Sequence, residues 1–181
     1  MKKLFFLVLI IVLLVIFVFA RFGRDLLFKD QVELLKKDIL FTAQTGSLAP
    51  DFIIKDVGGT QAPLSFFYTK KPVLLIFWST LCPFCAQELP DLNLFNQTYQ
   101  DKVIVIAVAS GESKQTIKKY IQNNKVNFLI SLDLERTVWK NYLAIGTPHH
   151  FLIAQDGKIL ANQAGRQTID QLESMLRRVL R

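Results

Sequence analysis

The stretch Phe77-Trp78-Ser79-Thr80-Leu81-Cys82-Pro83-Phe84-Cys85 contains both cysteines of the chain, with two residues between them. The run before the cysteines, Val73 to Trp78, is apolar and rich in β-branched and aromatic residues, which predicts a buried strand. Apolar residues then recur at helical spacing, and Pro83 suits the first turn of a helix because its missing N–H would have no partner there. The sequence therefore places Cys82 where a strand ends and a helix begins, with Cys85 inside the first turn.

This placement favours sulfur chemistry. The N-terminus of a helix carries partial positive charge, which favours a thiolate over a thiol. The thiolate is the nucleophile in thiol–disulfide exchange. We therefore expect Cys82 to be an exposed attacking sulfur and Cys85 a sheltered resolving sulfur. The two would form a redox-active disulfide, and no other cofactor is expected.

Two other interpretations of the cysteine pair stay open. Structural zinc needs about four ligands. The only other soft candidates, His149 and His150, are adjacent on a predicted strand and so point to opposite faces. A structural disulfide would close a very short loop and would therefore stabilise the fold little. Disulfide exchange is the favoured interpretation, and no metal site is predicted.

Residues 1–21 are predicted to anchor the chain in a membrane. Met1-Lys2-Lys3 precedes seventeen uncharged apolar residues, 4–20. This length is at the short end of spanning helices (about 17–25 residues) and beyond the apolar part of a secretory signal (about 7–15 residues). A cleaved signal peptide is the alternative. The lysines favour a cytoplasmic N-terminus, so the cysteine domain would work in the periplasm or an equivalent exterior space.

Residues 22–46 are predicted to be a stalk or linker, mostly helical, and residues 47–181 to be the redox domain. A partner-binding or dimerising helix is the alternative for the stalk. The net charge of +7 is spread along the chain. No basic cluster is interleaved with aromatic residues, so no nucleic-acid partner is expected.

In the rest of the domain, before and after the cysteines, strands and helices are predicted to alternate. Residues 49–56 and 63–66 are expected to form an N-terminal hairpin, and the helix after the cysteines is expected to break or kink at Pro90. The other elements are predicted as strands over 103–109, 128–131, 148–154 and 158–163, and as helices over 113–123, 134–142 and 168–181. This order predicts an α/β fold with a mixed central sheet.

Several short motifs, taken together, resemble one family. They are Ala49-Pro50-Asp51-Phe52, Phe77-Trp78, Cys82-Pro83-Phe84-Cys85, Glu88, Pro90, Gly146-Thr147-Pro148, Phe151-Leu152-Ile153 and Asp156-Gly157-Lys158. In this order, after an apolar N-terminal run, they resemble the membrane-anchored TlpA/ResA/DsbE family of thioredoxin-like proteins from about residue 46 to residue 181. The resemblance implies a thioredoxin-like α/β fold, with helices flanking the sheet, and thiol:disulfide oxidoreductase activity.

The resemblance also implies a cellular setting. Members are held by a single span in the bacterial inner (cytoplasmic) membrane, with the catalytic domain in the periplasm or on the outer side. They usually reduce disulfides of proteins, notably in cytochrome c biogenesis, and receive electrons from a membrane thiol transporter. Protein disulfides, that transporter and the membrane are accordingly the expected partners.

Single positions receive roles from the same resemblance. Pro148 matches the family's cis-proline, which faces the CxxC, and the backbone of Thr147 would pair with an extended substrate peptide. Glu88 matches an acidic residue that would hold or pass a proton beside the cysteines. The alternative for Glu88 is a solvated glutamate in the first turn of the helix. Substrate contacts are expected from Trp78, Pro83, Phe84, Thr147, Pro148 and His149.

Three departures from the family pattern concern the substrate-facing surface and the direction of electron flow. Leu81 stands where the family usually has tryptophan, and Pro83-Phe84 resembles the dipeptide of the oxidant DsbA. His149 follows the proline, and a charge there, if close to Cys82, would stabilise a thiolate and make the disulfide more oxidising. The alternative is that both histidines are exposed on their strand.

Three classes of function follow from these observations. Reduction of substrate disulfides is the favoured one. A dithiol oxidase or isomerase of the DsbA/DsbC type and a non-catalytic thiol-based binding module are the alternatives. A peroxidase is not favoured, because the sequence has a CxxC rather than a single peroxidatic cysteine.

Overall fold

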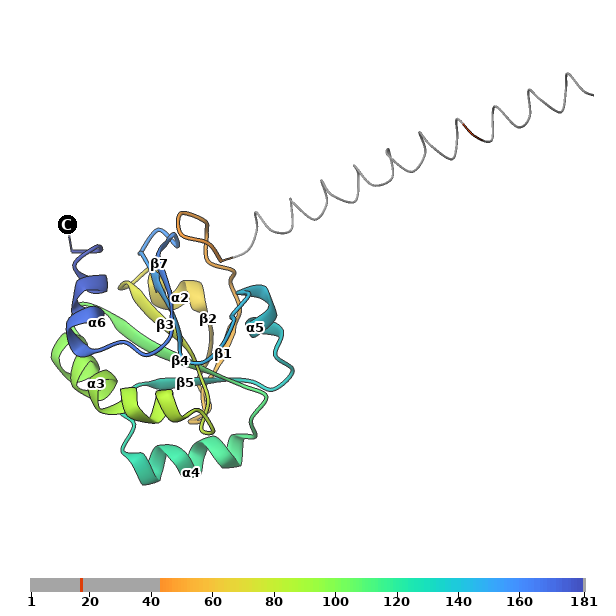
Figure 1. Ribbon diagram of the computed structural model, residues 1–181, viewed down its shortest axis with the longest axis vertical. Helices are drawn as coiled ribbons and strands as arrows, with labels where there is room; N and C mark the ends of the chain where they lie inside the picture. The colour runs from red at the N-terminus through yellow and green to blue at the C-terminus, as the bar shows by residue number, and fades with distance from the viewer. Residues whose placement is uncertain (1–16, 18–42, 181) are drawn as a thin grey trace, which may run out of the picture. The chain divides into compact units, whose positions relative to one another are not determined.

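The computed structural model of the chain describes residue 17 and residues 43–180 (Figure 1). The predicted anchor, apart from Phe17, and most of the predicted stalk lie outside these residues. Within the described part, no helix has both the length and the hydropathy needed to cross a membrane. The chain separates into two compact units, residues 1–40 and residues 41–181, and the second unit holds the cysteines.

A five-stranded sheet in the order β5-β4-β3-β6-β7 forms the centre of this unit. Its strands are β3 (Val73–Trp78), β4 (Ile104–Ser110), β5 (Leu129–Asp133), β6 (His149–Ile153) and β7 (Ile159–Ala164). Strands β3, β4 and β5 run parallel, whereas β6 pairs antiparallel with both β3 and β7. All six residues of β3 are buried, as expected for a strand covered on both faces. The predicted mixed sheet is confirmed.

Helices cover both faces of the sheet (Figure 1). They are α2 (Leu64–Tyr68), α3 (Pro83–Tyr99), α4 (Lys114–Asn124), α5 (Thr137–Asn141) and α6 (Ile169–Leu176). One core contains side chains of α3, α4 and α6 together with Trp78 and both cysteines. The other contains side chains of α2 and α5 together with Phe77. The cysteines therefore belong to the face of the sheet that α3 and α6 cover.

The two histidines of β6 lie on opposite faces of the sheet. Side chains alternate along a strand, so His149 shares a face with Phe151 of the second core, and His150 shares a face with Leu152 of the first. Both histidines are buried, at 3% and 0% exposed. The interpretation that they are exposed strand residues is therefore wrong, and only His150 faces the cysteine side.

Strands β1 (Ile53–Lys55) and β2 (Gln61–Pro63) pair antiparallel and form the predicted N-terminal hairpin. The hairpin is a separate two-stranded sheet. An isolated bridge between Asp56 and Ser131 connects it to β5. The hairpin thus packs at the β5 edge, away from β6 and β7.

Several predicted boundaries are wrong; helix α6, for example, ends at Leu176 rather than at residue 181. Two other errors have a clear physical reason. The return strand ends at Pro63, because Leu64 and Phe67 are three residues apart and a helix turns both of them into the core. Helix α5 starts at Thr137 rather than at residue 134, because Arg136 adopts a left-handed backbone (φ 57°) that the interior of a helix excludes.

Helix α3 continues through Pro90, so, of the predicted break or kink, the break is wrong. Proline removes the hydrogen bond to the carbonyl four residues earlier, which here is that of Ala86. Both residues are exposed, so solvent can satisfy this carbonyl. Leu92 and Phe95 hold the following turns against the core.

Candidate active site

Cys82 occupies the N-cap position of α3, as the sequence predicted. Its backbone is extended (φ −88°, ψ 113°), and Pro83 takes the first helical position. The Sγ atom of Cys82 accepts a hydrogen bond from the backbone N–H of Cys85 at 3.1 Å. This sulfur therefore pairs with one of the free N–H groups of the first turn and lies at the positive end of the helix.

The loop before β6 lies against the same sulfur. The Thr147–Pro148 peptide bond is cis, and the thiol of Cys82 donates to the Thr147 carbonyl oxygen at 3.2 Å. The structure thus brings the CxxC and the proline loop together, as predicted. Cys82 is 9% exposed and Cys85 is 0% exposed. Cys82 is less open than predicted, but of the two cysteines it is the more exposed.

Cys85 is held as a thiol. Burial raises the pKa of Cys85, and the hydrogen bond with Cys82 raises it further. A buried thiol keeps its proton because the thiolate would lose its solvation. Cys85 therefore needs a proton acceptor before it can attack another sulfur.

Glu88 is fully buried on α3, three residues after Cys85 and thus on the same side of the helix. Its Oε1 atom lies 2.7 Å from Nε2 of His150. The same oxygen accepts a hydrogen bond from the backbone N–H of Gln167 at 3.1 Å. Burial excludes the solvated first-turn interpretation of Glu88 and leaves the proton-handling one. Sequence reasoning missed its partner His150, which was weighed only as a zinc ligand or an exposed residue.

His149 does not approach the cysteines. Its Nδ1 accepts a hydrogen bond from the Ile145 N–H at 3.3 Å, and its Nε2 lies 2.5 Å from Asn162 Oδ1. Burial lowers the pKa of His149, although the hydrogen bond to Asn162 opposes this shift. The ring is therefore neutral at pH 7, and the predicted cation beside Cys82 is absent.

The substrate-facing surface differs from the prediction at Trp78. This side chain is 1% exposed, and its ring packs against Tyr120 at a centroid distance of 4.8 Å. Because a buried ring cannot contact a substrate, Trp78 supports the site by packing beneath it. Pro83 and Phe84, which were predicted to contact substrate, are both exposed beside Cys82.

Two exposed apolar residues extend this surface. Leu81 is 86% exposed immediately before Cys82, and Ile145 is 80% exposed immediately before the Gly146-Thr147-Pro148 loop. The sequence analysis missed Ile145. Its position immediately before the proline motif is the sequence signal that would have identified it. An apolar residue there belongs to no predicted helix or strand, so a role in core packing is not expected.

Glu112 is a third residue that was not predicted from the sequence. It follows β4, and one of its carboxylate oxygens accepts the Thr80 backbone N–H at 3.0 Å. The Thr80 hydroxyl donates to the other carboxylate oxygen. Both contacts fix the turn that leads from β3 into Cys82, so Glu112 positions the reactive loop. No local pattern in the sequence links residues 32 positions apart.

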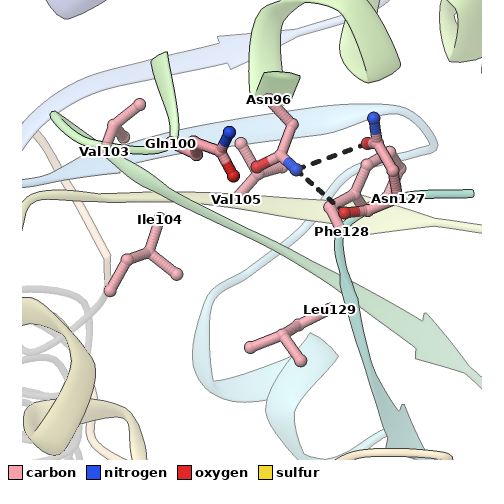
Figure 2. Close-up of a pocket in the computed structure, with 8 residues that line it drawn as sticks. All are labelled: Asn96, Gln100, Val103, Ile104, Val105, Asn127, Phe128 and Leu129. Carbon is pink, nitrogen blue, oxygen red and sulfur yellow. Dashed lines mark hydrogen bonds between the residues drawn. The ribbon is translucent and has the colours of Figure 1, made fainter. Parts of the chain in front are cut away.

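A pocket of about 340 Å³ lies away from the cysteines (Figure 2). Asn96 and Gln100 line it from the end of α3, and Val103 and Phe128 line it near the starts of β4 and β5. The Asn96 amide donates to the Asn127 carbonyl at 2.9 Å. Cys82 follows the other end of the parallel strands, so this pocket is not part of the cysteine site.

The site as a whole defines a class of protein. An N-cap cysteine, a buried second cysteine and a cis-proline loop against them are the parts of a thioredoxin-like thiol-disulfide oxidoreductase. Among residues 43–180, no group of three or more His, Cys, Asp and Glu side chains is placed to hold a metal ion.

The chain belongs to the AhpC/TSA family, whose model matches residues 45–162. It is 33% identical over 137 residues to the thiol-disulfide oxidoreductase ResA of Bacillus thuringiensis subsp. konkukian, covering 75% of this chain and 79% of the relative. It is 35% identical over 132 residues to ResA of Bacillus subtilis, covering 72% of this chain and 71% of the relative.

A solved structure supports the same assignment. The crystal structure of a protein described as a thiol:disulfide interchange protein DsbE, from Chlorobium tepidum, matches with a TM-score of 0.71 and 27% identity. The match covers 77% of this chain and 100% of that one. The fold is therefore thioredoxin-like, and the chain is a ResA/DsbE-like thiol-disulfide oxidoreductase with Cys82 and Cys85 as its CxxC.

Proposed function

We propose that this oxidoreductase reduces disulfides of substrate proteins. The Cys82 thiolate attacks one sulfur of the substrate disulfide, so that a mixed disulfide forms and the first substrate sulfur leaves and takes up a proton. Cys85 then loses its proton and attacks Cys82, which releases the second substrate sulfur. Two electrons pass to the substrate, and the enzyme is left with a Cys82–Cys85 disulfide.

The N-cap geometry is the observation that carries this proposal. Cys82 Sγ accepts the Cys85 N–H at 3.1 Å and is the cysteine that reaches solvent. Cys85 is fully buried behind it. This arrangement supports first attack by Cys82 and internal release by Cys85.

His149 supports the reducing direction. A cation beside Cys82 would stabilise the thiolate, and with it the reduced enzyme, which makes a disulfide more oxidising. His149 was the candidate for that cation, but it lies on the other face of the sheet and burial lowers its pKa. The exposed Pro83-Phe84 dipeptide, which resembles that of DsbA, is the observation that favours a dithiol oxidase as the second candidate.

The reduction potential of the cysteine pair tests the direction. We expect a value near that of thioredoxin, about −270 mV, rather than near that of DsbA, about −120 mV. The measurement equilibrates the full chain in detergent with dithiol redox buffers and traps the cysteines by alkylation. A value close to −120 mV would show an oxidase instead.

We also propose that residues 1–21 tether the domain to the bacterial cytoplasmic membrane and that the domain faces the periplasm or outer side. The uncharged apolar run 4–20 supports a span. A membrane thiol transporter would then return electrons to the cysteines. The exposed apolar side chains of Leu81, Phe84 and Ile145 suit an unfolded apolar substrate, such as an apocytochrome c before haem attachment.

Labelling of intact cells tests this orientation. A maleimide that cannot cross membranes is expected to modify Cys82 of the Cys85→Ser variant without cell lysis, once a reductant that also cannot cross membranes has released the substrates bound through Cys82, because Cys82 is on the outer side in the proposal. The Cys82→Ser, Cys85→Ser double variant is the control for background labelling. Modification that appears only after lysis would place the domain in the cytoplasm.

A further inference from the structure

His150 and Glu88 form a buried pair on the cysteine side of the sheet, and both side chains are 0% exposed. Nδ1 of His150 lies 3.3 Å from the backbone carbonyl oxygen of Gln163. A carbonyl oxygen only accepts hydrogen bonds, so Nδ1 carries a hydrogen. Nε2 lies 2.7 Å from Glu88 Oε1. Two bare acceptors would repel at this distance, so the pair of side chains carries a second proton, although Nε2 has no hydrogen bond of good geometry.

The surroundings favour an imidazolium opposite a carboxylate. Nδ1–H of the imidazolium then donates to the Gln163 carbonyl oxygen, Nε2 lies within ion-pair distance of the carboxylate, and the Gln167 N–H donates to that carboxylate at 3.1 Å. The other charged groups at this junction of α3 with the loop before α6 are Arg166 and Asp91, which pair with each other at 3.6 Å. Arg166 therefore does not compete with His150 as the cationic partner of Glu88. On β6 itself, His149 is neutral and faces the opposite core.

We propose that His150 is a positioning residue for the second step of disulfide reduction. It holds Glu88 as a buried carboxylate, and Glu88 takes the proton of Cys85. Glu88 Oε2 has no hydrogen-bond partner among the described residues, so one carboxylate oxygen is available as an acceptor. Cys85 and Glu88 are three positions apart on one helix, where side chains are about 5–6 Å apart at their Cβ atoms. This inference rests on the proposed function, since it requires a mixed disulfide at Cys82.

The step balances in atoms and charge. The proton of Cys85 moves to the Glu88 carboxylate, and the His150 imidazolium balances the new thiolate. The thiolate forms a bond with Cys82 Sγ as the bond from Cys82 to the substrate sulfur breaks, and the electron pair leaves with that sulfur. Glu88 returns its proton to the leaving thiolate or to solvent. Without a cation at residue 150, the carboxylate before the transfer and the thiolate after it would each be a buried charge with no counter-ion, which is costly.

An aromatic disulfide reagent, 5,5′-dithiobis(2-nitrobenzoate), separates the two steps in the full chain. Attack by Cys82 releases one thionitrobenzoate, and attack by Cys85 releases a second, so the two phases are resolved in one stopped-flow trace. The change is His150→Gln. We expect its second phase at pH 7 to slow by about a hundredfold, the lower end of the effects of acid–base groups. The first phase is expected to stay within about twofold, because Cys82 itself is untouched.

The dependence of the second-phase rate on pH distinguishes this role of His150 from a purely structural one. Burial raises the pKa of Cys85, so in His150→Gln only solvent removes its proton. The second-phase rate should then rise in proportion to hydroxide concentration over a pH range where the wild-type rate is already level. His149→Gln is the matched control, since this neighbour is equally buried but on the other face. It is expected to keep the wild-type second phase and its pH profile.

Two results would overturn the inference. One is a second phase in His150→Gln with the wild-type rate and pH profile. The other is equal slowing in His149→Gln, which would show a general effect of altering β6. Failure of the first phase in the wild type would count against the proposed function and not against the role of His150.

A measurement on the unaltered chain covers the case in which His150→Gln does not fold. The chain has two histidines, so ¹⁵N-histidine labelling gives only four ring nitrogens to assign. We expect His150 to show both nitrogens protonated at pH 7, and His149 to show one. A neutral His150 ring at that pH would overturn the inference.

Discussion

Replacing Cys85 with serine is expected to leave the protein covalently joined to its substrates through Cys82. The serine hydroxyl cannot attack the mixed disulfide, so the intermediate that Cys85 normally resolves accumulates. Replacing Cys82 with serine is expected to abolish both the adducts and the turnover, because Cys85 is 0% exposed and does not reach a protein substrate. The measurement is non-reducing electrophoresis of cells that express each variant, followed by identification of the bands that reducing agent removes.

The two variants control one another, since each changes a single sulfur to oxygen within the same turn of α3. The double variant sets the background. Adducts in the Cys82→Ser variant but not in the Cys85→Ser variant would reverse the assigned roles. Absence of adducts in both variants would favour the thiol-based binding module, which holds a ligand without exchanging disulfides.

The core of this site was predictable because its signals are local. An apolar run predicts β3, helical spacing predicts α3, and the two cysteines lie between them in the sequence. The contact between Cys82 and Thr147 spans 65 positions. It was predicted only because the motif around Pro148 resembles a family in which the same loop faces the cysteines.

The environment of Glu88 was not predictable from local signals. A glutamate near the start of a helix is equally consistent with a solvated residue. Its burial depends on His150 from β6 and on Gln167 from the loop before α6. Alternation along β6 did predict that the two histidines face opposite sides, but it did not say which of them faces the cysteines. That choice depends on how β6 registers with β3, where His150 lies opposite Ile76.

A second large effect is expected in the other core, at Phe77. This side chain is 0% exposed and contacts the rings of Trp139, Tyr142 and Phe151 at centroid distances of 5.6, 5.4 and 5.7 Å. Replacing Phe77 with alanine removes apolar burial and leaves a cavity among rigid rings. We expect the free energy of unfolding to fall by about 3–5 kcal/mol. This is a large share of the roughly 5–15 kcal/mol that holds an ordinary domain folded.

Phe84→Ala is the matched control, because Phe84 is 58% exposed on the first turn of α3. It is expected to change the free energy of unfolding by no more than about 0.5 kcal/mol. Urea denaturation of the full chain in detergent, followed by fluorescence, measures both variants. Phe84→Ala should instead slow the reduction of a protein disulfide more than that of a small disulfide reagent, since only a protein offers apolar side chains to this surface. Equal stability losses in the two variants would contradict the assignment of Phe77 to the core and of Phe84 to the substrate-facing surface.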